Sequence, residues 1–488
     1  MGKKIFAAVP LLLAGALAFS ACAPVPTPQQ SVLESDTTIS IMWNQPMYTM
    51  NAVTSDGNAT ANHNIIYLTR DNFIYYDKAL NVMQNKSYGS YEKISDSPLK
   101  IKMTLADTAQ WSDGVPVDVA DVVLAWASTS SAYNTITDPA KINELKNEDG
   151  TLKPVPGGAV YFNANINGVN LVKDYPEVSA DGKSATFTYS EPFADWENEM
   201  FYFGAGLPAH IVAKRALGVA DPTEAKAALL KAFQDNDKEA LSKLSNVWNL
   251  DWNYVQMPAD AELVVGCGAY NITEYKKGDY LTLTKNPQYK GELTAPTETI
   301  TVRYSEDPMA AVQALQNDEV QLISPQPTAD VLSALNALSN VTVISGDEST
   351  YEHVDLTFDN GGPFDPKTYK GDAAKALKVR QAFLKTIPRQ EIVDKIIKPL
   401  NPKAEVRNSF NLVPGSTNYA DTVAANGMKD QYGAVDIEGA KALLAEVGAK
   451  SPQVRILYGK SNVRRQQEFA LIKESAELAG FKIVDNGN

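Results

Sequence analysis

The chain has 488 residues, 44% of them hydrophobic and 21% charged, which is enough to bury cores for about two to four domains. Its formal net charge is −14, and no basic stripe with interleaved aromatic residues occurs. An acidic chain of this kind does not seek phosphate backbones, so we expect no nucleic-acid partner.

The N-terminal residues indicate export. Two lysines precede an apolar run over residues 5–21, which is shorter than the roughly 20 residues of a bilayer-spanning helix. Small residues then lead to Cys22 in "FSAC", which resembles a bacterial lipobox, although Phe19 replaces the usual leucine. An ordinary secretory signal with a chance cysteine is the alternative. We predict a signal peptide at 1–21, acylation of Cys22 and a proline-rich tether at 22–37.

Acylation of Cys22 determines the expected location of the protein. A chain anchored by lipids on its first mature residue stays outside the cytoplasm, on the outer face of the plasma membrane or in a periplasm. Cys267 is the only other cysteine, so lipidation of Cys22 leaves it unpaired. We expect Cys267 to be a small buried hydrophobe.

The predicted elements change character near residue 291. Before it the patterns favour strands and a long helical block, and after it strands alternate with helices, which is typical of an α/β domain with much parallel pairing. The expected elements are strands at 38–43, 99–105 and 184–189; helices between 196 and 247, including a surface helical hairpin; a hairpin at 263–287; strands at 298–304, 319–323, 340–345, 353–358, 453–458 and 481–485; and helices at 308–317, 328–337, 373–386, from 389, 436–447 and 463–479.

The stretch "WSDGVPVDVADVVLAW" (111–126) joins a turn to a helix start. Asp113 and the glycine after it favour a turn, Asp118 can cap the helix, and Asp121 suits its positively polarised first turn. Trp126 falls on the apolar stripe of that helix. We therefore interpret Asp113 and Asp118 as turn and cap residues rather than as catalysts.

Motifs for catalysis or metal binding are not apparent. The three histidines, His63, His210 and His353, lie far apart, and no HExxH, CxxC or GxSxG spacing occurs. His210 is expected to be a structural hydrogen-bonding residue. The chain has 58 acidic residues, and their spacing in the sequence does not exclude a catalytic carboxylate pair of the glycosidase type. We expect no enzyme, no metal and no cofactor.

Five segments carry a resemblance to one family. The segment at 111–122 resembles a "W-S-D-G-x-P-x-x-A-x-D-V" motif, and the others follow in matching order: "LPAHIV" (207–212), "VVGCGAYNITEYKKGDYLTLTKNPQYKG" (264–291), "AVQALQNDEVQL" (311–322) and "VRQAFLKTIPRQEIVDKI" (379–396). They resemble the family 5 extracellular solute-binding proteins, the peptide-binding receptors of ABC importers. Among the positions that depart from the family pattern are Cys267, Ala269, Gln321 and Pro388.

The resemblance implies an α/β, two-lobed hinged fold of the type II periplasmic-binding kind. We expect lobe I at 38–62 and 200–290, an extra α+β domain of lobe I at 63–199, and lobe II at 291–488. Family members continue past a "G-F-K-I" strand into a segment that supplies an acidic contact to the peptide's amino group. This chain ends at Asn488, before that segment, so we expect lobe II and its part of the binding site to be incomplete.

The resemblance also implies a function. The expected protein is a monomeric, lipid-anchored receptor that encloses oligopeptides between its lobes, largely through main-chain hydrogen bonds, and delivers them to ABC permease subunits. A receptor for another solute, such as an oligosaccharide, is the alternative within this class. A secreted hydrolase is the alternative from another class.

Ligand-binding residues are predicted from three places in the chain. Open α/β sheets bind ligands at the carboxyl ends of their strands, which favours the loop after the first strand. Trp43 could equally be a core residue. In dipeptide-selective members an arginine precedes the last helix, where this chain has Leu457 and Tyr458, which disfavours strict dipeptides. The predicted ligand-binding residues are Trp43, Asn44, Tyr48, Thr357, Asn360 and Tyr458.

Overall fold

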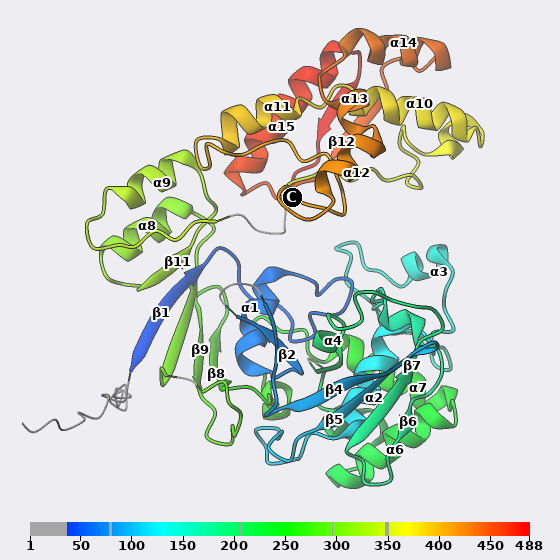
Figure 1. Ribbon diagram of the computed structural model, residues 1–488, viewed down its shortest axis with the longest axis vertical. Coiled ribbons are helices and arrows are strands. Elements are labelled where there is room, and N and C mark those ends of the chain that lie inside the picture. The colour runs from blue at the N-terminus through cyan, green and yellow to red at the C-terminus, as the bar shows by residue number, and fades with distance from the viewer. Residues whose placement is uncertain (1–36, 78–80, 205, 295, 347–350) are drawn as a thin grey trace, which may run out of the picture.

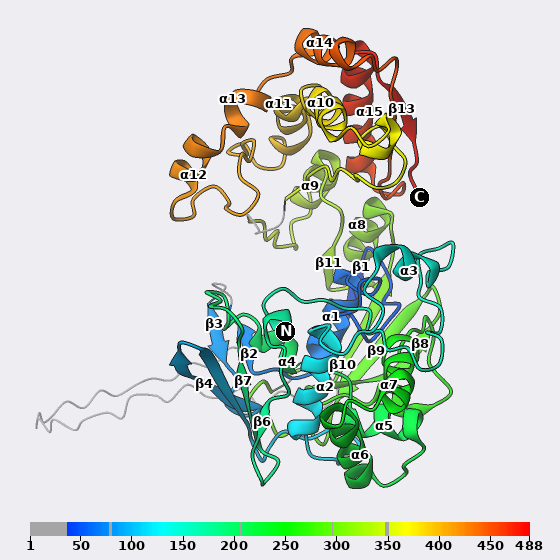
Figure 2. The same cartoon turned by 90° about the vertical axis from the view of Figure 1, so that its right-hand side faces the viewer.

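The computed structural model describes residues 37–488 apart from 78–80, 205, 295 and 347–350. The predicted signal peptide, the acylation of Cys22 and nearly all of the tether lie outside the described residues. Figures 1 and 2 show two bodies, one above the other in both views. We name residues 37–336 the first body and residues 351–488 the second body.

A five-stranded sheet organises the first body. Strand β1 pairs in parallel with β10 on one side and with β11, an edge strand, on the other, while β9 and β8 continue the sheet in antiparallel order. The carboxyl ends of β11, β1 and β10 therefore meet at one edge. In spatial order the strands are β11 (Leu322–Ser324), β1 (Thr38–Trp43), β10 (Thr299–Tyr304), β9 (Tyr280–Lys285) and β8 (Tyr270–Lys276).

A second, antiparallel sheet of four strands lies in the same body (Figure 1). The predicted alternation of "LKIKMTL" is confirmed, because every second side chain of β5 is buried. The strands of this sheet are β4 (Gly89–Asp96), β5 (Leu99–Leu105), β7 (Ser184–Thr188) and β6 (Glu177–Val178), and a separate two-stranded ribbon consists of β2 (Ile74–Tyr76) and β3 (Val82–Gln84).

Most helices of the first body pack their apolar faces onto one large core, while α3 packs on a small separate cluster around Leu152, Val155 and Tyr161. The predicted surface hairpin is helical, but α6 and α7 bury one face each, with Phe233 and Trp248 almost fully enclosed. The helices are α1 (Thr60–Thr69), α2 (Val119–Thr129), α3 (Pro139–Glu144), α4 (Met200–Gly204), α5 (Ala209–Leu217), α6 (Pro222–Gln234), α7 (Lys238–Leu250), α8 (Pro308–Gln316) and α9 (Ala329–Asn336), with short 3₁₀ turns at Val169–Leu171 and Ala261–Val264.

The predicted division of the chain does not coincide with the packed cores. Side chains from 38–62, 63–199 and 200–290 share one continuous hydrophobic core. Moreover, β10 and β11, which lie in the range assigned to lobe II, pair with β1 in the sheet of the first body. The core of the second body begins only at Phe364. The division into two lobes and an extra domain remains a proposal. Its limits do not coincide with boundaries between the hydrophobic cores.

The second body is smaller and mainly helical. Its strands β12 and β13 are parallel and are joined by α15, so the predicted succession of strand, helix and strand forms a βαβ unit. Its elements are α10 (Ala373–Leu384), α11 (Arg389–Ile392) with a π-helical continuation at Val393–Ile397, α12 (Tyr419–Asn426), α13 (Met428–Tyr432), α14 (Ile437–Val447), β12 (Gln453–Ile456), α15 (Val463–Leu478) and β13 (Lys482–Asp485), with a 3₁₀ turn at Pro366–Tyr369.

Two predicted strands are wrong. Residues 341–346 and 351–357 adopt neither helix nor strand, although 340–345 and 353–358 were expected to be strands. The first segment lies between the two bodies in the chain and the second begins the second body, and most of their side chains are exposed. Alternating apolar residues stabilise a strand only when a neighbouring strand accepts its hydrogen bonds, and here the flanking bodies supply none.

Candidate functional site

The candidate site lies where three parallel strands of the first body end. Asn44 and Gln45 directly follow β1, Glu306 follows β10 by two residues, and Gln326 follows β11 by two. Because these strands run in parallel, the side chains after them gather at one edge of the sheet, the edge at which open α/β sheets bind ligands.

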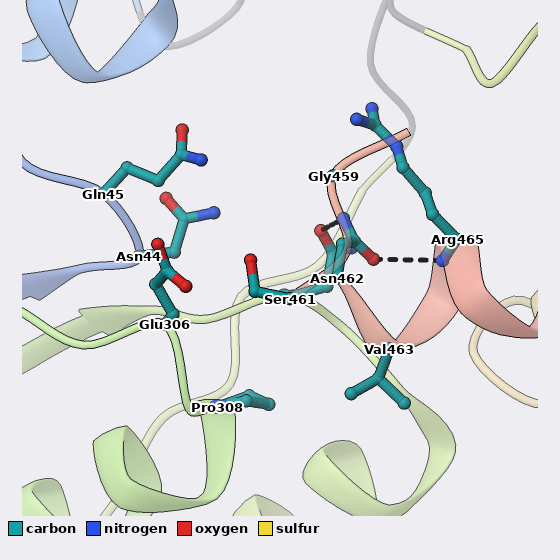
Figure 3. A pocket seen from close by; sticks show the side chains of 10 residues that line it. Asn44, Gln45, Glu306, Pro308, Gly459, Ser461, Asn462, Val463 and Arg465 are labelled. Atoms are coloured by element: carbon teal, nitrogen blue, oxygen red, sulfur yellow. Dashed lines mark hydrogen bonds between the residues drawn. The ribbon is translucent and has the colours of Figure 1, made fainter. Parts of the chain in front are cut away.

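The second body faces this edge. The loop 459–462 and the first turn of α15 complete a hollow that opens to solvent, which we name the interbody hollow (Figure 3). Across it, the side-chain amide nitrogen of Asn462 lies 2.7 Å from the amide oxygen of Gln326. The lining residues are Asn44, Gln45, Glu306, Pro308, Gln326, Gly459, Ser461, Asn462, Val463 and Arg465.

Two helices begin at the hollow, one from each side. Asp307 caps α8 by accepting the backbone N–H groups of Met309 at 2.8 Å and Ala310 at 3.2 Å. Asn462 caps α15 by accepting the backbone N–H of Arg465 at 3.1 Å. These hydrogen bonds fix the capping side chains, so both sides of the rim of the hollow are held by helix caps.

The charges around the hollow are unevenly paired. Arg465 lies 3.4 Å from Glu352, which also pairs with Arg464, so the cations of α15 are compensated. Beneath them, burial and the neighbouring Glu352 raise the pKa of Glu468 to about 7, and Arg464 at 4.0 Å does not offset this. In contrast, the carboxylate of Glu306 has no hydrogen bond or ion pair with any described residue.

The structure places the predicted site residues in different surroundings. Asn44 lines the interbody hollow. Tyr458 directly precedes the lining loop, but its ring stacks on Phe469 at 5.1 Å. Trp43 is half-buried and packs against the large core, in agreement with the alternative interpretation of Trp43 as a core residue. Tyr48 donates its hydroxyl to the backbone oxygen of Asp56 at 2.9 Å and does not line the hollow.

Thr357 and Asn360 lie apart from that hollow. Both are exposed, and Asn360 lines a separate open depression on the second body together with Tyr369 and Arg455. Its side-chain oxygen accepts the backbone N–H of Gly362 at 3.0 Å. The structure therefore brings Asn44 close to the loop after Tyr458, but it does not bring Thr357 or Asn360 to the same place.

Sequence reasoning missed the six other lining residues that carry polar side chains, namely Gln45, Glu306, Gln326, Ser461, Asn462 and Arg465. Gln45 and Glu306 could have been found with the rule that selected Asn44, because each follows a predicted strand of the same sheet. Gln326 and Arg465 had no comparable signal. Their place depends on β11 joining β1 and on the approach of α15, which no local pattern in the sequence specifies.

Four of the five segments that carry the resemblance lie in the first body, and the fifth, 379–396, lies in the second. His210 Nε2 lies 2.8 Å from the carboxylate of Asp113, and the backbone N–H of Ser112 donates to Gly266 at 2.8 Å, so three of the five segments contact one another. Asp118 caps α2 within a capping box, as expected. Cys267 is buried and unpaired, and burial raises the pKa of its thiol to about 12.

Within residues 37–488, outside the four gaps given above, no three histidine, cysteine or carboxylate side chains gather in a way that could hold a metal ion. Across the same residues, none of the helices combines the length and the apolar character that crossing a bilayer requires.

Comparison with solved structures shows the fold. The periplasmic EDTA-binding protein EppA superimposes with a TM-score of 0.63 at 19% identity, covering 95% of this chain and 77% of EppA. The oligopeptide-binding protein AppA from Bacillus subtilis, in complex with a nonapeptide, gives a TM-score of 0.58 at 15% identity, covering 93% of this chain and 75% of AppA. The predicted two-lobed α/β solute-binding fold is confirmed.

Sequence comparison agrees with the fold. An uncharacterized lipoprotein of Mycobacterium tuberculosis is 23% identical over 445 residues, which are 90% of this chain and 68% of that protein. A putative ABC transporter peptide-binding protein of Brucella abortus is 31% identical over 196 residues, 39% of this chain and 34% of its own length. The family model described as bacterial extracellular solute-binding proteins, family 5 Middle, matches residues 86–484. The chain therefore belongs to the family 5 bacterial extracellular solute-binding proteins.

Proposed function

We propose that this chain is the extracytoplasmic receptor of an ABC importer, which captures oligopeptides in the interbody hollow and delivers them to the permease. The observation that carries the proposal is the hollow itself. It lies at the carboxyl edge of the parallel strands, and side chains of both bodies line it. A ligand bound there contacts both bodies at once, and such contacts favour a closed arrangement of the two.

The chemistry of the lining supports a peptide as the ligand. Amides and a hydroxyl predominate: Asn44, Gln45, Gln326, Ser461 and Asn462. Each amide offers both a donor and an acceptor, which suits the alternating N–H and C=O groups of a peptide main chain. The names of the Brucella relative and of AppA, which state peptide binding for those proteins, point in the same direction.

The remaining parts of the proposal follow from that role. Acylation of Cys22 would keep the receptor near its permease, and the lipoprotein name of the mycobacterial relative supports such an anchor. The proposed receptor is a monomer and performs no catalysis. Its selectivity would rest on the length and the ends of the peptide rather than on the side chains, because main-chain recognition tolerates varied sequences.

A thermal-shift screen tests the proposal. The panel holds peptides of two to eight residues and short oligosaccharides. A ligand at 100 times its dissociation constant should stabilise the folded state by about 2.7 kcal/mol. We expect peptides to give such shifts. Shifts with sugars alone would discard peptide specificity, and cleavage of a peptide substrate would overturn the receptor role.

A pair of variants locates the site. Gln45 has no side-chain hydrogen bond to any described residue, so Gln45→Ala should weaken peptide binding about three- to tenfold while leaving the melting temperature of the free protein unchanged. Gln234→Ala, at the exposed end of α6 and outside the hollow, is the matched control and should bind peptides like the wild type. Equal affinities of the two variants would place the peptide elsewhere.

A further inference from the structure

A cluster of polar side chains joins the two bodies beside the interbody hollow. We name it the interbody cluster, and it consists of Gln326 from the first body and Glu352, Arg464 and Glu468 from the second. Arg464 and Glu468 are one turn apart on α15, and their side chains are only 18% and 13% exposed. Because solvent screens these charges little, a change in one of them acts on the others.

The amide of Gln326 is the first body's part of this cluster. Asn462 Nδ2 lies 2.7 Å from one end of the amide, and guanidinium nitrogens of Arg464 lie 3.1 Å and 3.3 Å from the other end. Both neighbours are donors, and the single amide oxygen can turn toward either of them. When the oxygen faces Arg464, the guanidinium of the second body is hydrogen-bonded directly to the first body.

Arg464 has one carboxylate in place and a second one within reach. Its guanidinium donates to the carboxylate of Glu352. Its Nε lies 4.0 Å from Oε1 of Glu468, which is too far for a hydrogen bond, and both atoms are buried without a partner among the described residues. A movement of about 1 Å would join them. Because the guanidinium is a rigid plane, the same movement would shift the nitrogens that face Gln326.

The charges that act on Glu468 come from Glu352, Arg464 and Arg465. Burial and Glu352 raise the pKa of Glu468 to about 7, and the two arginines lower it only in part. Other elements also pack on α15, and their charged side chains are paired elsewhere or exposed: Lys395 with Glu391, Asp394 with Lys398, Lys441 with Glu438, Glu446 with Lys378, and the exposed Lys482 and Asp485 of β13. The ionisation of Glu468 therefore acts chiefly on Arg464.

We propose that the interbody cluster is a proton-controlled latch between the two bodies. With Glu468 neutral, Arg464 stays on Glu352 and Gln326 and holds the second body in the arrangement of Figures 1 and 2. With Glu468 ionised, its carboxylate draws Arg464 along α15, the contact with Gln326 is lost, and the second body is released.

The direction of the pH response follows from linkage. Arg464 stabilises the carboxylate of Glu468 fully only in the released arrangement, so Glu468 binds its proton more tightly in the latched one. Low pH therefore favours the latched arrangement and high pH the released one. A receptor with this latch would close on its ligand more readily in acid. That consequence rests on the proposed function, whereas the latch itself acts without a ligand.

The test measures the distance between the bodies by double electron–electron resonance in the ligand-free chain. Spin labels are placed with Gln234→Cys on α6 and Ala445→Cys on α14, two exposed positions, in a Cys22→Ser background. Cys267 is 3% exposed and stays unlabelled. We expect one main distance at pH 5.5 and a second, more widely distributed one at pH 8.5. The ratio of the two populations should change about tenfold, which corresponds to one unit of pKa difference between the arrangements.

Variants assign the response to the cluster. Asp71 and Glu199 of the first body also have raised pKa values, of about 6 and about 7, so the pH response alone does not identify the group. Glu468→Gln cannot ionise and should keep the pH 5.5 distance at pH 8.5. Gln326→Leu removes the acceptor of the first body and should show the second distance at both pH values. Glu477→Gln removes the same charge from an exposed site on α15 and should respond like the wild type.

The outcomes separate the latch from the proposed function. Circular dichroism melting first confirms that each variant is folded. Equal distances at both pH values, or a pH response that Glu468→Gln retains, would overturn the latch and leave peptide binding standing. If the distances respond as expected but no peptide binds at either pH, the latch stands and the proposed function fails.

Discussion

The two bodies of this protein have hydrophobic cores of different size. The first holds Trp111, Trp126, Trp248 and Trp252 almost fully buried in one core that spans both of its large sheets. The second depends on a smaller core around three phenylalanines, Phe364, Phe383 and Phe481, and on a two-stranded sheet. One wall of the hollow is therefore supported by a large hydrophobic core and the other wall by a small one.

The hydrogen bonds between the bodies reinforce this contrast. Within the first body, the segments around Asp113, His210 and Gly266 are joined directly. Between the bodies, the described lining of the hollow contributes the contact of Asn462 with Gln326. We therefore expect ligand contacts to influence the orientation of the second body relative to the first. We also expect the two bodies to unfold separately.

A substitution in the core of the first body should give the greatest loss of stability. Trp126 is fully buried, its indole N–H donates to the backbone oxygen of Val172 at 2.9 Å, and its ring packs on Tyr133 and Phe187. Trp126→Ala should cost about 4 kcal/mol, because the cavity cannot collapse fully. Differential scanning calorimetry should show the loss in the transition of the first body alone. A shift of both transitions by the same amount would mean that the bodies unfold as one unit.

A smaller effect tests the ion pair that ties α6 to α2. Lys226 and Asp121 are both buried and lie 2.8 Å apart, with Asp118 at 3.2 Å from the same ammonium. Burial opposes the charge of Lys226, yet the two aspartates hold the pKa of this lysine above its ordinary value. Asp121→Asn should cost about 3 kcal/mol, since it leaves a poorly compensated buried cation and loosens the cap.

Urea denaturation followed by tryptophan fluorescence measures this cost. The double variant Asp121→Asn, Lys226→Met provides the control, because it removes the stranded charge together with its partner. It should be less destabilised than the sum of the two single variants. Strict additivity would show that the pair contributes nothing as a pair.

The second body offers the matching core substitution. Phe383 is 1% exposed and lies between the rings of Phe364 at 5.4 Å and Phe481 at 5.5 Å. Phe383→Leu should cost about 1.5 kcal/mol, since leucine fills most of the volume but loses the ring contacts. Calorimetry should place this loss in the transition of the second body. An effect on the first body would contradict the separation of the two cores.

The smallest effect concerns pH. Burial and Glu352 raise the pKa of Glu468 to about 7 from an ordinary 4.5. Between these values the folded chain binds the proton more tightly than the unfolded chain, so this group's contribution to stability is present at low pH and is lost as pH rises through about 7. After allowance for screening by solvent, the loss between pH 5 and pH 8 should be about 1 kcal/mol.

Glu468→Gln should remove this part of the pH dependence and melt higher than the wild type at pH 8. Glu477→Gln, on the same helix and 45% exposed, is the control and should follow the wild type. If Glu468→Gln melts lower than the wild type at pH 8, the pair with Arg464 stabilises the second body and the stated direction is wrong.

Local patterns predict helices and strands in both bodies, but not the segment that joins them. The alternation in 99–105 and the cap at Asp118 depend on neighbouring residues alone, and the structure confirms both. The segments 340–345 and 353–358 show that alternation without a partner strand is insufficient. Of the site, the rule for strand ends selected Asn44 but not Glu306, and Arg465 comes to the hollow only through the packing of α15. Such contacts between distant segments cannot be derived from periodicity.

The most direct test of the central claim is hydrogen–deuterium exchange with and without the peptide that stabilises the chain most. We expect slower exchange on both walls of the hollow, at 44–48 and 305–310 in the first body and at 459–466 in the second. Protection confined to one body, or found only around Asn360 and Arg455, would contradict binding between the bodies.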